Sequence, residues 1–266
     1  MRPLITVEEL ASSRGSIHIC DIRWDLTDPD KGRATYEEGH IPGAVFVDLD
    51  RDLSAPPGSA GRHPLPDPAD FAASLGRLGI RPASHVVVYD DVAGRMAARM
   101  WWMLRSIGHE KVQLLDGGYQ AWVAAGHEVD GDTVIPEPTV YPEPEGFTGT
   151  VSHDQLAGRT VVDARAAERY RGDFEPVDPK AGHIPGAINI PTSENVDENG
   201  RFHDMSTLED IYDGLESPVM ACGSGVTACH DALAMVVAGR EMPDVYVGSF
   251  SEWSRLGLPV TTGSEP

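Results

Sequence analysis

Basic residues are scarce in this 266-residue chain, which holds 21 Lys and Arg against 42 Asp and Glu and has a formal net charge of −21. Binding to a nucleic-acid backbone requires a basic surface, so this charge argues against nucleic acid as a partner. An anionic substrate would need individual arginines that overcome a repulsive background field.

Long apolar runs and cysteines are also few. No stretch approaches 18 uninterrupted apolar residues, and the first ten residues, MRPLITVEEL, carry acid by Glu8. We therefore expect no signal peptide and no membrane partner. Three cysteines without CxxC spacing argue against a disulfide framework and against a metal site of the zinc type. We expect a cytoplasmic protein with reduced thiols.

The chain repeats itself in four blocks that occur twice in the same order. The paired blocks are CDIRW (20–24) and VDARA (162–166), GHIPGAVFVDL (39–49) and GHIPGAINIPT (182–192), VVVYDD (86–91) and PVMACG (218–223), and LLDGGYQAW (114–122) and VYVGSFSEW (245–253). Matched blocks in the same order predict two copies of one fold.

Each copy alternates short apolar strands with helical patterns, which is typical of a mainly parallel sheet flanked by helices. The predicted fold class is therefore α/β, with two tandem domains. Residues 136–146 hold four prolines within nine residues and predict an extended linker. We expect an N-terminal domain over 1–135, the linker over 136–146 and a C-terminal domain over 147–266.

Cys222 lies where an apolar segment changes to a glycine-rich one in PVMACGSGVTACHDALAM (218–235). An apolar strand precedes it, and Gly223, Gly225 and a helical pattern follow it. In open parallel sheets, functional sites collect at such strand ends. The glycines let the turn curl, so that its N–H groups and the positive helix end point inward. A thiol there should favour its thiolate form, and the same amides would stabilise a persulfide.

Cys222 is therefore the predicted nucleophile, whereas Cys20 and Cys229 lack this context and are interpreted as packing residues. A phosphatase of the cysteine-loop kind would need an arginine where Ala228 stands. A cysteine protease would need a histidine near the thiol, and His230 is expected two helical turns from the loop mouth. Thiol–disulfide exchange would need a suitably spaced second cysteine.

The motifs CGSGVTA (222–228), VDAR (162–165), LDGGYQAW and the repeated GHIPGA together resemble the tandem-domain sulfurtransferases of the rhodanese family, over essentially the whole chain. The loop is most similar to that of the 3-mercaptopyruvate sulfurtransferases. Thiosulfate-preferring relatives carry two basic residues after the cysteine, where this chain has Gly223 and Ser224. The resemblance implies two rhodanese-like domains, the first of them non-catalytic because Asp90 aligns with Cys222.

The resemblance also implies a reaction without a cofactor. The Cys222 thiolate would take the sulfur of a small anionic donor, 3-mercaptopyruvate, to form a persulfide and pyruvate. A thiophilic acceptor would then remove this sulfur, either cyanide or a thiol such as that of a thioredoxin-like protein. Two other functions stay open: a thiosulfate:cyanide sulfurtransferase and a non-catalytic module that carries a persulfide to a protein partner.

Family roles fall on further residues of this chain. Arg165 resembles the arginine that binds the donor carboxylate, and Arg169 is a weaker candidate. The substrate-binding loop would comprise Gly223, Gly225, Val226 and Thr227.

A serine, a histidine and an aspartate are implied to polarise the donor carbonyl and to manage its proton. Ser224 and His63 match the first two, and Asp50 is the best match for the third. The segment between Asp50 and His63 is about two residues longer than in relatives, so Asp48 is the alternative. His40 and His183 occur in both copies and are interpreted as hydrogen-bonded turn residues.

Overall fold

The computed structural model describes residues 1–266, which divide into two compact units. The first unit comprises Met1–Ser54, Pro66–Thr148 and Glu198–Phe202, and the second comprises Ala55–Leu65, Gly149–Asp197 and His203–Pro266. A short segment of each half of the sequence, Ala55–Leu65 and Glu198–Phe202, therefore belongs to the unit formed mainly by the other half. The predicted domain ranges are contiguous and do not include this exchange. We call Ala55–Leu65 the exchanged loop.

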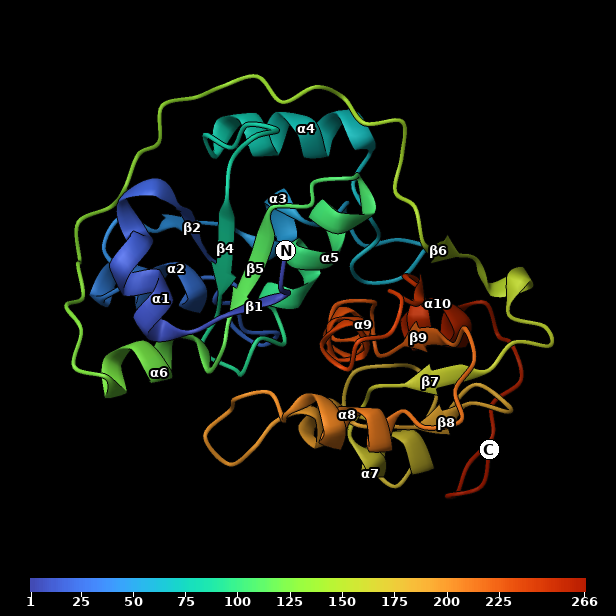
Figure 1. Cartoon of the computed structure of the whole chain (residues 1–266). Coiled ribbons are helices and arrows are strands. Elements are labelled where there is room, and N and C mark those ends of the chain that lie inside the picture. Colours follow the sequence, from blue (N-terminus) through green and yellow to red (C-terminus); the bar gives the residue numbers. More distant parts are fainter. The chain divides into compact units, whose positions relative to one another are not determined.

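The first unit is built from five strands and six α-helices (Figure 1). In chain order its elements are β1 (Leu4–Ile5), α1 (Val7–Ser13), the 3₁₀ turn η1 (Arg14–Ser16), β2 (His18–Asp21), α2 (Lys31–Glu38), β3 (Val45–Phe46), α3 (Leu49–Asp52), α4 (Pro68–Arg77), β4 (Val86–Tyr89), α5 (Ala97–Ser106), β5 (Val112–Leu115) and α6 (Gly118–Ala124).

The second unit has five strands and four α-helices. Its elements are β6 (Thr150–Val151), the 3₁₀ turn η2 (His153–Gln155), β7 (Val161–Asp163), α7 (Ala167–Arg171), β8 (Ile188–Asn189), the 3₁₀ turn η3 (Thr192–Asn195), α8 (Met205–Ile211), β9 (Val219–Ala221), α9 (Ala228–Val237), β10 (Asp244–Tyr246) and α10 (Ser249–Arg255).

The two sheets have the same topology, which confirms the predicted α/β fold of two copies. Their strand orders are β1-β5-β4-β2-β3 and β6-β10-β9-β7-β8, and every pair of neighbouring strands is parallel. The strand before Asp90 (β4) and the strand before Cys222 (β9) therefore occupy the same central position. Since functional sites of parallel sheets lie at carboxyl strand ends, this position sets the candidate site.

Local sequence signals account for several elements. Strand β4, with the sequence VVVY, is apolar without alternation and buried throughout, as expected for a strand covered on both faces. Helix α4 begins where the Asp67 side chain accepts a hydrogen bond from Ala69 N and Pro68 takes the first helical position. The apolar pattern beginning at Ala97 forms α5, and Gly108, with φ of +83°, follows its end.

Helices cover both faces of the first sheet (Figure 1). Side chains of α1 and α6, including Leu10 and Trp122, pack against one face around Val87 and Tyr89. Helix α5 contacts β4 and β5 from the opposite side. In the second unit, Tyr170 and Phe250 pack on one face of the sheet, while α9 contacts β9 and β10 and is itself contacted by α8.

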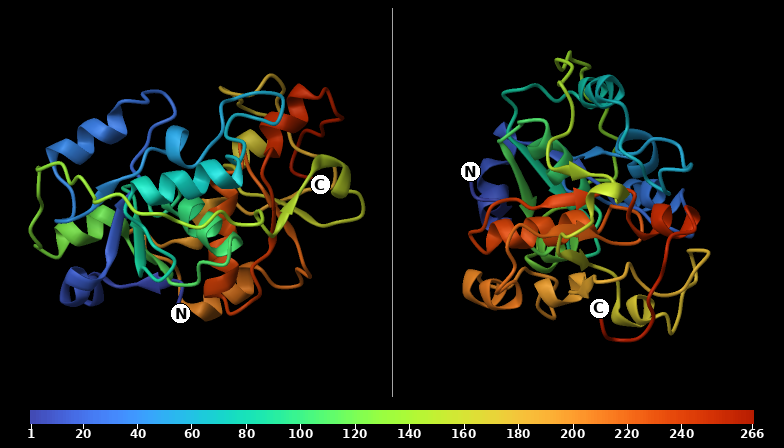
Figure 2. Two further views of the ribbon diagram at one scale, coloured as in Figure 1. Left: turned by 90° about the horizontal axis from the view of Figure 1, so that it is seen from above. Right: turned by 90° about the vertical axis from the view of Figure 1, so that its right-hand side faces the viewer.

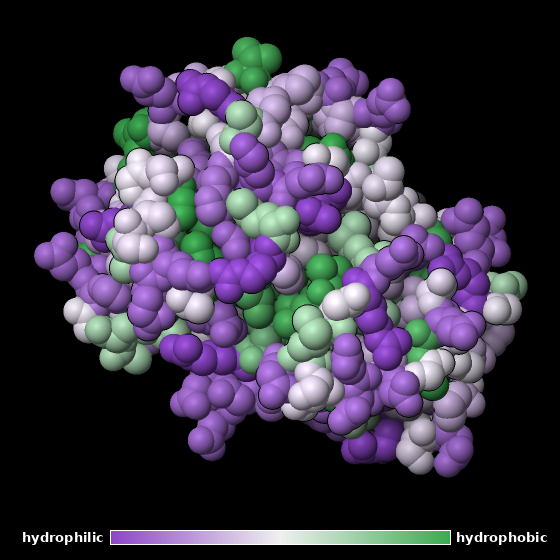
Figure 3. All heavy atoms as spheres, viewed as in Figure 1, coloured by the Kyte–Doolittle hydropathy of each residue, from purple (hydrophilic) through white to green (hydrophobic).

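The proline-rich residues 136–146 form no helix or strand and follow an extended path (Figure 2). The N–H of Thr139 donates to the carbonyl of Gly76 at 2.8 Å, so the segment is held beside α4. Hydrophilic side chains predominate on the face of the molecule drawn in Figure 3. No helix combines the length and apolar character needed to cross a bilayer.

An aspartate–arginine pair is repeated at the end of the second strand of each unit. Arg23 donates from Nη2 to Asp21 at 2.7 Å and to the carbonyl of Gly39 at 2.8 Å. Arg165 donates from Nη2 to Asp163 at 2.6 Å and to the carbonyl of Gly182 at 2.7 Å.

The two arginines also stack on equivalent aromatic rings. The Arg23 Cζ lies 4.4 Å from the ring centre of Tyr119, and the Arg165 Cζ lies 4.0 Å from that of Phe250. Each arginine is only 3% exposed. Because the same contacts recur in the copy without a cysteine, they belong to the fold. The role of Arg165 as the ligand of the donor carboxylate stays a prediction.

The GHIPGA histidines are likewise repeated structural residues. His40 Nδ1 lies 2.8 Å from the carbonyl of Tyr36 and its ring stacks on that tyrosine at 3.9 Å. His183 has the same two contacts with Tyr170, at 2.8 and 3.7 Å. The interpretation of both as hydrogen-bonded turn residues is confirmed.

Replacement of Arg165 should therefore affect folding. Arg165→Gln leaves Asp163 buried without its partner, which should cost about 3–5 kcal/mol of the free energy of unfolding. Arg23→Gln should cost about the same in the first unit, since Asp21 loses the same partner. Chemical denaturation checks both values, with Arg171→Gln, on an exposed ion pair, as the control that changes stability by less than about 0.5 kcal/mol. A stable Arg165→Gln variant that only binds donor more weakly would contradict the assignment.

Candidate active site

Cys222 follows the last residue of the central strand β9 and begins the turn that leads into α9 at Ala228. Its side chain is nearly enclosed, with the residue 2% exposed. The backbone N–H of Gly225 points at the sulfur, with 3.1 Å between Gly225 N and Cys222 Sγ. The turn therefore curls over the thiol and supplies a hydrogen-bond donor for negative charge on it.

A glycine is required at position 225 by both conformation and space. Gly225 has φ of +77°, and a Cβ there would lie 2.2 Å from the carbonyl oxygen of Val247. The start of α10 holds the same turn, because Phe250 N donates to the Cys222 carbonyl at 3.0 Å and Ser251 N donates to the Gly223 carbonyl at 2.8 Å. The remaining predicted loop residues, Val226 and Thr227, lead directly into α9, and Val226 is buried.

Ser249 also supports the cysteine, a role that sequence reasoning missed. Its hydroxyl accepts a hydrogen bond from Cys222 N at 3.0 Å and lies 4.0 Å from the sulfur. Ser249 has φ of +51°, a conformation that non-glycine residues rarely adopt, and the matching residue of the first unit is Gly118 with φ of +58°. A strained serine in place of that glycine, beside Cys222, is typical of a functional position. The sequence does carry a signal for this role, because alignment of LLDGGYQAW (114–122) with VYVGSFSEW (245–253) places Ser249 opposite Gly118.

In the equivalent turn of the first unit, the backbone N–H groups bind a carboxylate. Asp90 occupies the place of Cys222, and both of its carboxylate oxygens accept hydrogen bonds from turn N–H groups at 2.7–2.9 Å. The four donors are Val92, Gly94, Met96 and Ala97. Burial raises the pKa of Asp90, while these donors oppose the rise. A built-in carboxylate thus fills the anion-binding turn of the first copy.

Ser224 and His63 are brought together as predicted by the family resemblance. His63 Nδ1 lies 2.8 Å from Ser224 Oγ, and both residues are buried. His63 comes from the exchanged loop, which packs on the second unit through further contacts. Arg62 N donates to Ser251 Oγ at 3.1 Å, and Arg255 Nη1 donates to the carbonyl of Gly58 at 2.9 Å.

The two candidate aspartates both lie in the first unit. Asp50 is exposed, and its Oδ2 accepts a hydrogen bond from Trp24 Nε1 at 2.9 Å. Asp48 caps α3 by accepting hydrogen bonds from the N–H groups of Asp50 and Arg51. The carboxylate of Asp48 is therefore engaged in starting a helix, and the pairing of Asp50 with His63 stays a prediction.

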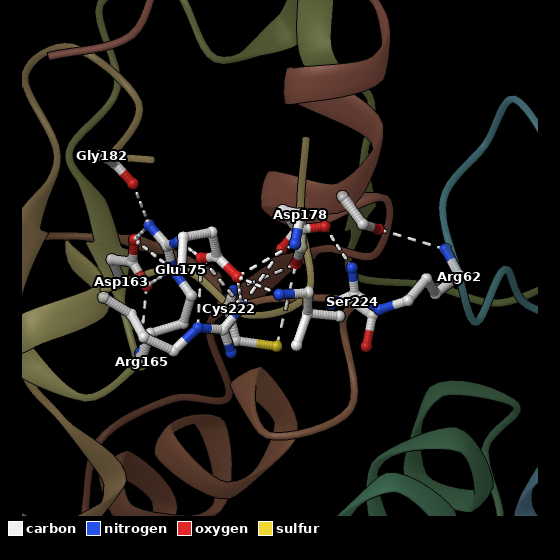
Figure 4. A network of polar contacts seen from close by, with 12 residues as sticks. Arg62, Asp163, Arg165, Glu175, Asp178, Gly182, Cys222 and Ser224 are labelled. Carbon is white, nitrogen blue, oxygen red and sulfur yellow. Dashed lines mark hydrogen bonds and ion pairs between the residues drawn. The ribbon is translucent and has the colours of Figure 1, made fainter. Parts of the chain in front are cut away.

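Six charged side chains of alternating sign form a connected series of ion pairs around Cys222 (Figure 4). In order, this charge series comprises Asp163, Arg165, Glu175, Arg169, Asp178 and Arg62. The first four N–O distances along it are 2.6, 3.3, 2.8 and 3.2 Å, and the last link joins Asp178 Oδ1 to Arg62 Nη1.

Two of the three arginines of the charge series are partly exposed to solvent. The three carboxylate side chains are 0–4% exposed, whereas those of Arg62 and Arg169 are 13% and 21% exposed. Burial favours a higher pKa for Glu175, but hydrogen bonds from Arg169 and from the N–H groups of Asp178 and Val177 outweigh it and lower the pKa. Glu175 is therefore ionised at neutral pH and fixes the Arg169 guanidinium.

Cys20, Cys229 and His230 lie in surroundings that differ from those of Cys222. Burial raises the pKa of the Cys20 thiol, which favours its unreactive protonated form. Cys229 donates from Sγ to the carbonyl of Gly225 at 3.4 Å. His230 is fully buried on α9, with its Nδ1 3.2 Å from Nδ2 of Asn195. No group of three or more His, Cys, Asp or Glu side chains could hold a metal ion.

Comparison with known proteins matches this geometry to one family. The model of the rhodanese-like domain matches residues 6–125 and 151–256. A Pseudomonas aeruginosa protein named "Probable 3-mercaptopyruvate sulfurtransferase" is 43% identical over 278 residues, which cover 98% of each chain. The thiosulfate sulfurtransferase of Rattus norvegicus is 34% identical over 288 residues, covering 99% of this chain and 96% of the rat protein.

Among solved structures, the 3-mercaptopyruvate sulfurtransferase of Leishmania major superposes with a TM-score of 0.86 at 31% identity, covering 96% of this chain and 75% of that one. The two matches to the rhodanese-like domain model, 6–125 and 151–256, each cover most of one of the two sheets. The chain belongs to the rhodanese family and contains two rhodanese-like domains.

Proposed function

We propose that this protein is a sulfurtransferase that moves a sulfur atom from 3-mercaptopyruvate, through a persulfide on Cys222, to a thiophilic acceptor. The observation that carries the proposal is the Cys222 turn, in which the Gly225 N–H donates to the sulfur and two part-exposed arginines, Arg62 and Arg169, lie close to Gly223. Relatives named for this activity span nearly the whole chain.

In the first half-reaction the Cys222 thiolate attacks the donor sulfur. A sulfur–sulfur bond forms, and the carbon–sulfur bond of the donor breaks with its electron pair left on carbon as the enolate of pyruvate. The proton of the donor thiol ends on this carbon, so the products are pyruvate and a Cys222 persulfide. Such covalent catalysis predicts ping-pong kinetics.

Backbone N–H groups of the turn would hold the charge of the persulfide, as the equivalent turn holds the Asp90 carboxylate. The binding residues are therefore the predicted loop positions Gly223, Gly225, Val226 and Thr227. Gly223 and Ser224 bring no positive charge, so the turn suits a sulfur with a single charge better than a sulfonate dianion.

Ser224 and His63 would polarise the donor carbonyl and carry the proton to the departing enolate. Their 2.8 Å contact allows proton transfer between Oγ and Nδ1. Asp50 would orient His63, and this part of the assignment comes from the family resemblance. Arg169 would bind the donor carboxylate, since its guanidinium is half-buried and held in place by Glu175.

The acceptor would be cyanide or a thiol, including that of a thioredoxin-like protein. All three cysteines are unpaired thiols, which supports a reducing compartment such as the cytoplasm. The donor preference distinguishes the proposal from a thiosulfate:cyanide sulfurtransferase, and rapid multiple turnover with a small acceptor distinguishes it from a passive persulfide carrier.

Removal of the nucleophile should abolish the reaction. We expect the wild-type chain to gain the mass of one sulfur atom after exposure to 3-mercaptopyruvate, and Cys222→Ser to gain none and to transfer none to cyanide. Intact-mass spectrometry and thiocyanate assay measure the two outcomes. Cys20→Ala removes a thiol of the first unit and should keep both the adduct and the transfer. A sulfur adduct on Cys222→Ser would exclude the covalent scheme.

The serine and histidine should matter mainly for the carbonyl donor. Ser224→Ala and His63→Gln should lower kcat with 3-mercaptopyruvate by about 10²- to 10⁴-fold, because the enolate loses its proton source. Turnover of thiosulfate should fall much less, since that donor has no carbonyl and its departure needs no proton on carbon. Asp50→Asn should show the same split if Asp50 orients His63. Steady-state kinetics with both donors measure the split, and equal losses would contradict the assigned roles.

A further inference from the structure

Arg62 directs its side chain to the same place as Arg169. A Cβ placed on Gly223 would lie 2.9 Å from Arg62 Nη2 and 3.5 Å from Arg169 Nη1. Both guanidiniums therefore converge on the residue that follows Cys222, one from the exchanged loop and one from α7. Asp178 joins them, with Oδ1 bound to Arg62 and Oδ2 bound to Arg169.

The contacts of Arg62 leave part of its hydrogen-bonding capacity for a ligand. Nη1 is paired with Asp178, while Nε is buried and has no hydrogen-bond partner. An unpartnered buried donor costs free energy in a finished structure. Arg165 differs in this respect, since its Nε, Nη1 and Nη2 all donate to protein oxygens.

The exchanged loop fixes Arg62 together with the proposed proton carrier. Arg62 N is bound to Ser251, and the next side chain, His63, is bound to Ser224. Ser251 in turn donates from N to the Gly223 carbonyl at 2.8 Å. The positions of Arg62, His63 and the cysteine turn are thus coupled through short hydrogen bonds.

The geometry points to Arg62 as a substrate-binding residue that, with Arg169, grips the carboxylate of the donor and selects donors that carry one. This inference rests on the proposed function. Arg62 Nη2 and Arg169 Nη1 are the guanidinium nitrogens nearest Gly223, and each can donate to a carboxylate oxygen, which a sulfur donor without this group does not offer. Gripped there, the carboxylate lies beside Gly223, and the sulfur-bearing carbon two bonds away can approach Cys222.

A pair of donors separates binding of the carboxylate from general damage. 3-Mercaptopyruvate and 1-mercapto-2-propanone share the carbonyl and the thiol, and the second carries a methyl group in place of the carboxylate. Arg62→Gln should lower kcat/KM for 3-mercaptopyruvate by about 10- to 100-fold and leave that for 1-mercapto-2-propanone nearly unchanged. Arg62→Lys keeps the charge without the planar fork and should fall between the two.

Arg255→Gln is the matched control, because Arg255 binds the exchanged loop at Gly58 and does not belong to the charge series. It should leave the preference between the two donors at the wild-type value. Equal losses for both donors in Arg62→Gln would mean that Arg62 only holds the loop, and an unchanged preference would mean that it does not bind the carboxylate. Either result overturns the inference.

Binding of pyruvate provides a readout that needs no sulfur transfer. Calorimetric titration should give a Kd for pyruvate that Arg62→Gln raises about 10-fold or more, with Arg255→Gln unchanged. A wild-type chain that forms no Cys222 adduct, yet binds pyruvate in an Arg62-dependent way, would contradict the proposed function and keep the carboxylate site. Pyruvate binding that does not depend on Arg62 would overturn the site itself.

Discussion

The charge series from Asp163 to Arg62 is the constraint on which the rest of the candidate site depends. Its three carboxylates are almost completely buried and would be costly without their arginine partners. Of its three arginines, Arg165 is buried and pairs with Asp163 at one end, whereas Arg169 and Arg62 are partly exposed. A chain of net charge −21 thereby holds two partly exposed guanidiniums close to Gly223. In the proposed function these two arginines, and not the overall charge of the chain, allow an anionic donor to bind.

The two units show how one framework serves two purposes. Both have the same strand order, the same aspartate–arginine pair and the same stacked histidine. They diverge at the turn after the central strand, where the first unit places the carboxylate of Asp90 and the second places the sulfur of Cys222. A fixed carboxylate satisfies the N–H groups permanently, whereas a sulfur can gain and lose a second sulfur. Ser249 in place of Gly118 marks the same divergence on the neighbouring element.

Much of the fold and the position of the Cys222 turn could be predicted from the sequence, because both depend on local sequence patterns. Apolar strands and the repeated blocks indicate two parallel α/β units, and the glycines around Cys222 indicate a turn at the end of a strand. The ion pair of Arg165 with Asp163 could not be predicted from the VDAR motif, because a motif gives a residue type without its partners. The matching Arg23, in the copy without the cysteine, forms the same pair. The place of Arg62 could not be predicted, because its loop belongs to the second unit and such an exchange depends on tertiary contacts that no local pattern encodes.

In the proposed function, the turn after β9 holds a transferred sulfur atom among its backbone N–H groups. A crystal structure of the chain after exposure to 3-mercaptopyruvate would show this atom directly. We expect a second sulfur bonded to Cys222 Sγ, within hydrogen-bond distance of N–H groups of residues 224–227, and unmodified Cys20 and Cys229. A second sulfur turned away from these N–H groups, or carried by another cysteine, would contradict the proposal.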